Sequence, residues 1–153
     1  TGIDIYLPTG EFDKTHLANP GRNYWTFEPV LGLTYLSDSG IEVSGKFMYD
    51  FNTKNTDTDY ESGQEFHFDY ALGYHLGKQW VLGVAGYYYR QTTDDEIDGQ
   101  KVLDGFKGRA FAAGPAASYS FRNMNLSLKY QKEFDADDRP EGDKYWLKFT
   151  YAF

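Results

Sequence analysis

The chain contains no cysteine, which excludes disulfide bonds and thiolate chemistry. It also contains no run of about 20 apolar residues, the length that a membrane-spanning helix needs. A helical membrane protein is therefore excluded, whereas a β-barrel, which presents only alternate residues to lipid, is not. Basic residues are in the minority, with 15 Lys and Arg against 23 Asp and Glu, and they form no cluster that would meet phosphates. Nucleic acid is not an expected partner.

Aromatic residues, in contrast, make up 19% of the 153 residues, with 14 Tyr and 12 Phe. Two classes of β-protein explain such an excess: transmembrane barrels, which carry aromatic girdles at the membrane interfaces, and carbohydrate-binding β-sandwiches. The length suits a single domain, residues 1–153. No signal peptide opens the chain, so we expect a mature or trimmed product.

The segment Lys144–Phe153 alternates without a break between an aromatic, apolar face and a face that carries two lysines and a threonine. A period of two residues is the pattern of a β-strand. An aromatic residue such as Phe153 at the end of this strand is similar to the signature that the assembly machinery of bacterial outer-membrane barrels reads. The segment therefore favours a barrel, although a soluble edge strand shares the pattern.

Seven further segments alternate in the same way, which predicts an all-β fold of eight antiparallel strands. Their connections are alternately long and short, as in up-and-down barrels whose tight turns face the periplasm and whose long polar loops face outward. The acidic loops Asp94–Asp98 and Asp135–Asp143 lack the spacing of an EF-hand and are expected to be solvated. The predicted strands are Gly2–Pro8, Tyr24–Leu36, Ile41–Asn52, Gln64–Leu76, Gln79–Thr92, Arg109–Phe121, Met124–Phe134 and Lys144–Phe153.

The class of barrel depends on which face points inward. In a soluble lipocalin-like barrel the apolar face surrounds a ligand and the polar face meets water. Here the aromatic residues gather near the strand ends, as at the two interfaces of a membrane, and the polar face carries small and oppositely charged residues that can pair in a lumen. We therefore predict an up-and-down transmembrane β-barrel in the outer membrane of a Gram-negative bacterium.

The interior of a closed eight-stranded barrel is just filled by side chains, and charges buried there must pair. We expect Lys46, Lys129 and Lys148 each to lie near a carboxylate, and the small residues Ala110 and Ala112 to leave room along one wall. A polar conduit would require a wider barrel. The predicted lumen-facing polar network comprises Glu28, Glu42, Lys46, Asp50, Glu65, His67, Asp69, Lys129, Glu133 and Lys148.

Three polar residues, Glu65, His67 and Asp69, alternate on one face, a pattern that metal sites and acid–base sites share with salt-bridge networks. A salt-bridge network is the favoured interpretation. No motif links a serine to His67 or His75, as an activated nucleophile would require. We therefore expect no enzyme activity, no catalytic residue, no metal and no cofactor.

Short motifs along the chain resemble one named family. They are LPTG at residues 7–10, LGYH at 72–75, WVLGVAGYYY at 80–89, AGP at 113–115 and RPEG at 139–142. These motifs are similar to those of the meta-pathway phenol-degradation outer-membrane proteins. Members of that family are generally longer, with more strands ahead of this region, so the resemblance implies a shortened or C-terminal version.

The resemblance also implies a porin-like barrel for passive uptake of hydrophobic or aromatic compounds. Because eight strands leave little room inside, we expect no large ion conductance. The partners of such a barrel would be membrane lipid, lipopolysaccharide, the barrel-assembly machinery and a hydrophobic small molecule. A substrate path is expected among the outer loops near Tyr87 and Tyr89. Two alternatives remain open: a closed structural barrel with a charge-paired lumen and no transport, and a soluble lipocalin-like ligand-binding barrel.

Overall fold

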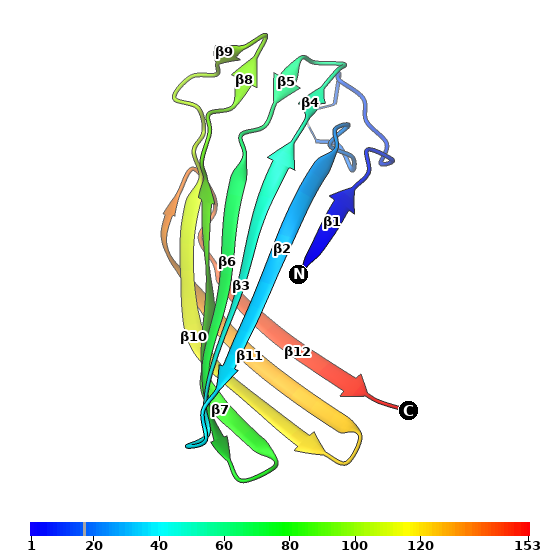
Figure 1. The fold of residues 1–153 in the computed structure, drawn as a ribbon. Helices are drawn as coiled ribbons and strands as arrows, with labels where there is room; N and C mark the ends of the chain where they lie inside the picture. The colour runs from blue at the N-terminus through cyan, green and yellow to red at the C-terminus, as the bar shows by residue number, and fades with distance from the viewer. Residues whose placement is uncertain (17) are drawn as a thin grey trace.

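The computed structural model describes residues 1–16 and 18–153, and all of the regular structure in them is β (Figure 1). No helix in this part of the chain is long and apolar enough to cross a membrane. The predicted all-β, antiparallel fold is confirmed, because eight strands form one sheet in which their spatial order is their order in the chain. They are β1 (Gly2–Tyr6), β2 (Thr26–Leu36), β3 (Ile41–Asn52), β6 (Glu65–Leu76), β7 (Trp80–Gln91), β10 (Arg109–Phe121), β11 (Met124–Asp137) and β12 (Asp143–Tyr151).

Tight turns join these strands at one end of the sheet. In the β2–β3 turn the Ser37 hydroxyl accepts the backbone N–H of Ile41 at 2.9 Å, and Gly40 adopts a φ of 87°. Gly77 in the β6–β7 turn has a φ of 65°, and Arg122 in the β10–β11 turn has a φ of 52°. Positive φ values let the chain reverse direction within a few residues, so consecutive strands pair antiparallel.

The long connections at the other end contain a second sheet that the sequence did not predict. It consists of four strands in the order β4 (Lys54–Asn55), β5 (Tyr60–Glu61), β8 (Glu96–Ile97) and β9 (Gln100–Lys101). Each has two residues, which is too short to show a periodic pattern. The connections from β3 to β6 and from β7 to β10 thus form a structured extension beyond the long strands (Figure 1).

The ladders of the long sheet are interrupted at prolines and at a bulge, and the β10–β11 ladder skips Gly114 and Pro115. Between β2 and β3 the ladder skips Glu28 and Pro29, since proline has no N–H to donate. In β11 the register to β10 shifts near Asp135, which has a φ of 55°, as at a β-bulge. The bulge lets β11 continue to Asp137, past the end predicted at Phe134.

The two faces of the long sheet differ in polarity. Large apolar side chains point outward from the curved sheet and are exposed, as Leu72 and Leu147 are. The buried apolar residues are few and mostly small, namely Met48, Ala85, Ala110 and Ala112. The buried polar residues are Thr26, Glu28, Asp50, Asn52, Asn55, Gln91, Asp95, Gln131 and Glu133. The molecule therefore has a largely polar interior and an apolar outer surface.

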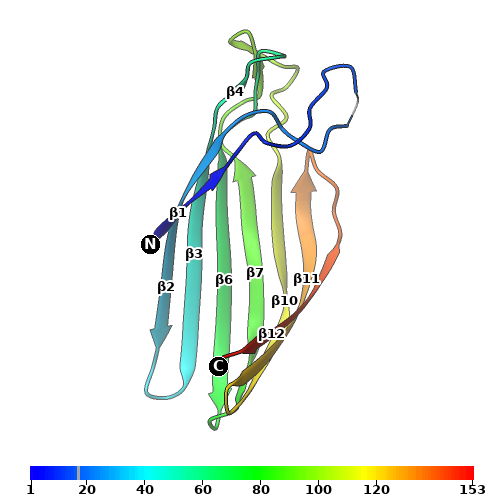
Figure 2. The same cartoon turned by 90° about the vertical axis from the view of Figure 1, so that its right-hand side faces the viewer.

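The expected closed barrel is not formed within the described residues. β1 and β12 are the two edges of the sheet and do not pair with each other, so the sheet is curved but open (Figure 2). β1 has five residues and pairs only with Thr26–Val30 of β2. Closure requires a consistent tilt and stagger around the whole ring, and so short an edge strand does not offer β12 a continuous partner.

Tyr70 of β6 crosses over Gly86 of β7 to reach β10. Its hydroxyl donates a 2.9 Å hydrogen bond to the carbonyl oxygen of Ala112, and the centre of its ring lies 6.0 Å from that of Phe111, with the rings stacked. A Cβ at position 86 would overlap both the Ala112 carbonyl oxygen and the Tyr70 hydroxyl. Glycine is therefore required for this contact across three strands.

Replacing Gly86 with alanine is expected to lower the free energy of unfolding by about 1–3 kcal/mol, because the added methyl group overlaps backbone that cannot move freely. Gly32 on β2 is the matched control, since a Cβ there meets no atom of the described residues within 4 Å and alanine is favoured over glycine inside a strand. Urea unfolding followed by tryptophan fluorescence compares the two variants. Equal midpoints for G86A and G32A would contradict the role assigned to Gly86.

Candidate functional site

The polar side of the curved sheet encloses a hollow of about 970 Å³. A second hollow, of about 530 Å³, lies among the long loops. Arg22, Glu65 and Gln91 line both spaces. The two hollows therefore meet at the end of the sheet that carries the long loops.

Much of the predicted polar network lies on this side of the sheet. Asp69 of β6 faces Lys46 of β3 in one ladder and Tyr87 of β7 in the next. Glu42 lies toward the tight turns, where its Oε2 is 2.7 Å from Nε2 of His75. Lys148 faces Ser127 in the β11–β12 ladder. The network residues that line the larger hollow are Lys46, Glu65, His67, Asp69 and Lys129, and those that are buried are Glu28, Asp50 and Glu133.

The expected pairing of the lysines with carboxylates is found only in part. Lys46 and Asp69 are neighbours in the β3–β6 ladder. Among the described residues, however, no ion pair within 4.0 Å involves Lys46, Lys129 or Lys148. The Lys129 ammonium instead lies 5.8 Å from the centre of the Trp146 ring. An open sheet keeps β11 and β12 away from the acidic strands β2 to β6, which removes the facing partners that a closed barrel would supply.

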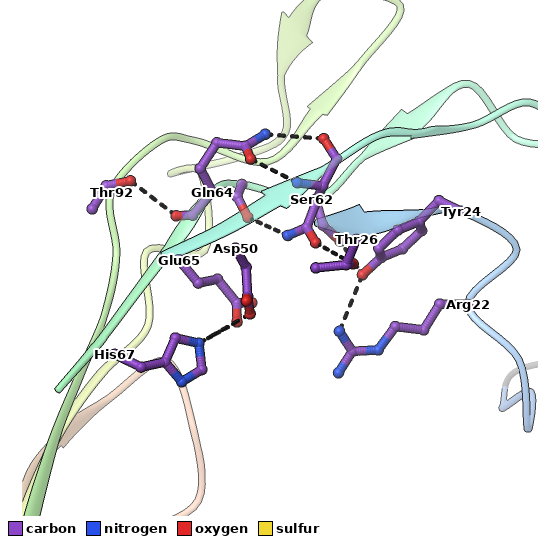
Figure 3. A network of polar contacts seen from close by, with 11 residues as sticks. Arg22, Tyr24, Thr26, Asp50, Ser62, Gln64, Glu65, His67 and Thr92 are labelled. Atoms are coloured by element: carbon purple, nitrogen blue, oxygen red, sulfur yellow. Dashed lines mark hydrogen bonds and ion pairs between the residues drawn. The ribbon is translucent and has the colours of Figure 1, made fainter. Parts of the chain in front are cut away.

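A cluster of carboxylates surrounds His67 at the loop end of the sheet (Figure 3). Its Nε2 lies 3.1 Å from Oδ2 of Asp50 and 3.3 Å from Oε2 of Glu65. Asp69, which the alternation grouped with Glu65 and His67, is not part of the cluster. Asp50 takes its place, because it lies directly opposite Glu65 in the β3–β6 ladder. Sequence reasoning followed one strand, and only the register between two strands reveals this partner.

A second cluster joins β7, β11 and β12 around Glu133. The Lys144 ammonium lies 3.1 Å from Oε1 of Glu133, and the Tyr87 hydroxyl donates to the same oxygen. The backbone N–H of Gly142 donates to Oε2 at 2.7 Å. A buried carboxylate is thus satisfied by three kinds of donor, as buried charge requires.

The two tyrosines of the predicted path, Tyr87 and Tyr89, lie beside this cluster and line the larger hollow. A cation covers each ring: Lys144 lies 4.3 Å from the centre of the Tyr87 ring, and Arg139 lies 4.1 Å from that of Tyr89. In the β7–β10 ladder the tyrosines face Ala112 and Ala110, which are completely buried at 0% and 1% exposure. The room expected beside these alanines is therefore already filled, and the hollow is lined instead by the two tyrosines and the cations that cover them.

Asp95 ties the loops to the strand ends. Its Oδ1 accepts the backbone N–H of Gly63 and the side-chain amide of Gln91, each at 2.7 Å, and its Oδ2 accepts the Tyr60 hydroxyl. Burial, together with the Asp95 carboxylate, raises the pKa of Tyr60 above its usual value, so this hydroxyl remains a donor. The expectation that the acidic loop is solvated is wrong for Asp95, which is buried.

The neighbouring carboxylate, Asp94, remains at the surface of the same loop. The ammonium groups of Lys107 and Lys101, 3.2 Å and 3.3 Å from its Oδ1, hold the pKa of Asp94 below its usual value. Because the pKa is depressed in the folded protein, ionised Asp94 stabilises the folded loop at pH values above the ordinary pKa of aspartate. This stabilisation is lost as the pH falls through the depressed pKa. Around neutral pH the loop is therefore held by ionised Asp94.

The histidine rings of the sheet have only carboxylate partners. Within residues 1–16 and 18–153, no serine or threonine hydroxyl is hydrogen-bonded to His67 or His75. The hydroxyls of Ser118 and Ser127 bond to each other and to Asn125.

The chain was also compared with known protein families. A family model described as "Putative MetA-pathway of phenol degradation" matches residues 1–149. A search of curated proteins found no match to the chain. The family match spans both hollows and seven complete strands of the long sheet, and it reaches into β12.

Replacing Asp95 with asparagine is expected to destabilise the loop extension by about 2 kcal/mol. The three groups that donate to Asp95 lose a charged acceptor, and at least one of them then faces the amide NH₂ of asparagine, which cannot accept a hydrogen bond. Asp98 in the same loop has a φ of 52°, which asparagine tolerates, so D98N is the matched control. Hydrogen exchange of residues 53–63 and 93–108 measures the effect. Unchanged protection in D95N would contradict the role of Asp95.

Proposed function

Because the chain belongs to the phenol-degradation family that matches residues 1–149, we propose that it is an outer-membrane β-barrel protein for passive uptake of hydrophobic or aromatic compounds. The family description supplies the class of compound. The apolar outer face and the polar inner face of the sheet support the proposed outer-membrane location. The hollow lined by Tyr87 and Tyr89 is the proposed path.

The observation that carries the membrane location is the apolar outer face. Leu33, Leu72, Leu128 and Leu147 are 59%, 49%, 51% and 70% exposed, although each lies within a long strand. A soluble lipocalin-like barrel would turn these side chains inward. Exposed apolar surface over a whole sheet leads to aggregation in water but is stable against lipid.

Aromatic side chains reinforce this outer face. A single row crosses five neighbouring strands in register, and its members are Phe47, Phe68, Tyr88, Phe111 and Phe134. A second group, near the tight turns, consists of Tyr35, Tyr74, Trp80, Tyr119 and Phe121. Two aromatic levels are typical of the interfacial girdles of membrane barrels. The proposed partners of this face are membrane lipid and lipopolysaccharide, and Phe153 is the proposed signal to the barrel-assembly machinery.

The edges of the sheet determine how wide the barrel is. In lipid, every backbone N–H and C=O needs a partner, so β1 and β12 must both be paired in the membrane. Pairing with each other gives the alternative function, a closed structural barrel with a charge-paired lumen and no transport. Pairing with further strands gives a wider barrel that keeps the hollow open.

The proposed path enters among the long loops, where the two hollows share Arg22, Glu65 and Gln91. Tyrosine rings offer aromatic compounds stacked or edge-on contacts. The charged groups beside the rings, Glu133 and Lys144, are already paired with each other. We therefore propose a binding route without catalysis, with no nucleic-acid partner and no part in the reaction chemistry of degradation.

The membrane location is tested by one pair of adjacent residues on opposite faces of β6. Leu72→Arg places a charge on the outer face and is expected to destabilise the protein in bilayers by about 2–4 kcal/mol. Ala71→Arg places the same charge on the polar side, in the hollow, and is expected to cost much less. Urea titrations in lipid vesicles measure both variants. A folded, monomeric protein in buffer without detergent would refute the location.

Uptake is tested in asymmetric bilayers with lipopolysaccharide in one leaflet, which slows hydrophobic solutes. The wild type is expected to raise toluene flux above that of protein-free bilayers and to give little ion current. Tyr89→Ala is expected to lower the flux several-fold, because it removes a ring from the path. Tyr145→Ala, on the exposed outer face, is the control. Flux that does not depend on protein would refute uptake, and large stable currents would indicate an open pore.

A further inference from the structure

The cluster around His67 has the geometry of a metal site. The ligand atoms of Asp50, Glu65 and His67 all lie within 4.8 Å of one another. We propose that these three residues bind one divalent transition-metal ion of the Zn²⁺ type at the loop end of the larger hollow. This site goes beyond the proposed uptake function and does not depend on it.

The charge balance of the cluster favours a cation. Asp50 and Glu65 share a single imidazole, and Glu28, which is also buried, approaches Asp50 from the neighbouring strand β2. Arg22 attracts Glu65 and Asp50 electrostatically, but its guanidinium donates to the Tyr24 hydroxyl at 3.4 Å (Figure 3). Among the described residues, His67 is the one cationic side chain within 4.0 Å of these carboxylates, and buried charges are stable only when they are paired or coordinate metals.

An unpartnered oxygen supplies a second, independent observation. Asp50 is 7% exposed, and its buried Oδ1 has no hydrogen-bond partner among the residues that the structure describes. The other oxygen of the same carboxylate, Oδ2, faces His67 at 3.1 Å. A buried acceptor without a donor is costly, and a metal ion within the cluster would compensate it.

The donor set selects the type of ion. One imidazole nitrogen with carboxylate oxygens suits Zn²⁺ and similar ions, whereas Ca²⁺ and Mg²⁺ prefer oxygen alone. Ligand bonds of about 2.0–2.2 Å in a tetrahedral site place the ligand atoms about 3.3–3.6 Å apart. The distances of 3.1 Å and 3.3 Å from His67 to the two carboxylates are close to this spacing.

Three protein ligands leave one position of a tetrahedral ion open. The position faces the hollow, because Glu65 and His67 both line it, and Tyr89 lies next to His67 with its ring centre 5.1 Å away, edge to face. Water or an oxygen atom of a bound compound would complete the coordination. The ion would also link the end of β3 to the start of β6, where the two hollows meet.

The site is tested on the full chain in detergent micelles, after treatment with a chelator. Zn²⁺ binding is measured by calorimetry, and Co²⁺ is used as a spectroscopic substitute. The wild type is expected to bind one Zn²⁺ with micromolar or tighter affinity and to give the Co²⁺ absorption of a tetrahedral site. His67→Gln and Asp50→Asn are each expected to weaken binding at least tenfold.

Two control variants separate this site from general attraction by acidic groups. His75→Gln removes an imidazole that has only one carboxylate partner, Glu42, at the other end of the same strand. Asp69→Asn removes a carboxylate from the same strand and face, outside the cluster. Both are expected to bind Zn²⁺ as the wild type does. If either control weakens binding as much as H67Q, the assignment is refuted.

A proton shared between Glu28 and Asp50 is the competing explanation for the unpartnered oxygen. It predicts that the wild type binds no Zn²⁺ at concentrations up to about 100 μM, and that result would refute the metal site. Should H67Q fail to fold, Glu65→Gln provides a third ligand variant, and its affinity must also fall. Wild-type affinity in both E65Q and D50N would equally refute the site.

Discussion

The polar interior of the sheet is the constraint on which the rest of the structure depends. Carboxylates and amides removed from water each need a donor or a cation. Asp95 is satisfied by a backbone N–H, an amide and a phenol, and Glu133 by a lysine, a phenol and a backbone N–H. Both of these centres, together with the carboxylates around His67, lie at the loop end of the sheet, whereas the Glu42–His75 pair lies near the tight turns. Most of the hydrogen-bonded carboxylate clusters therefore lie near the end of the sheet where the two hollows meet.

This order explains why the long loops are structured. A polar loop of this length would ordinarily be mobile, because it buries little apolar surface. Here Asp95, in the connection from β7 to β10, accepts a hydrogen bond from Gly63, in the connection from β3 to β6. The four short strands pair across the same two connections. The Asn52 side-chain amide donates to the Gly63 carbonyl at 2.9 Å, and the Gln64 side chain bonds to the backbone of Asn52. Amide and carboxylate side chains therefore replace the hydrophobic contacts that hold most loops.

The long strands could be predicted from the sequence because alternation is a local property. The bounds of β3 and β10 agree with the prediction, and the family resemblance is confirmed by the match to residues 1–149. Three features could not be predicted, since each depends on contacts between strands. The small sheet has strands too short to show a period, Asp50 joins His67 only through the β3–β6 register, and closure depends on the length and stagger of β1. The burial of Asp95 likewise depends on two loops meeting.

The apolar outer face and the free edges, taken together, restrict the states in which the sheet can be stable. In water, the outer face would drive association, and unpaired edges would add strands from other copies. In lipid, the outer face is satisfied, but unpaired backbone at β1 and β12 costs several kcal/mol for each group. For the membrane location that we propose, both demands are met by a ring in which β1 and β12 are paired and the polar face is enclosed. The number of strands in such a ring would decide whether the tyrosine-lined hollow is a passage or a filled core, because the space inside a barrel grows with strand number.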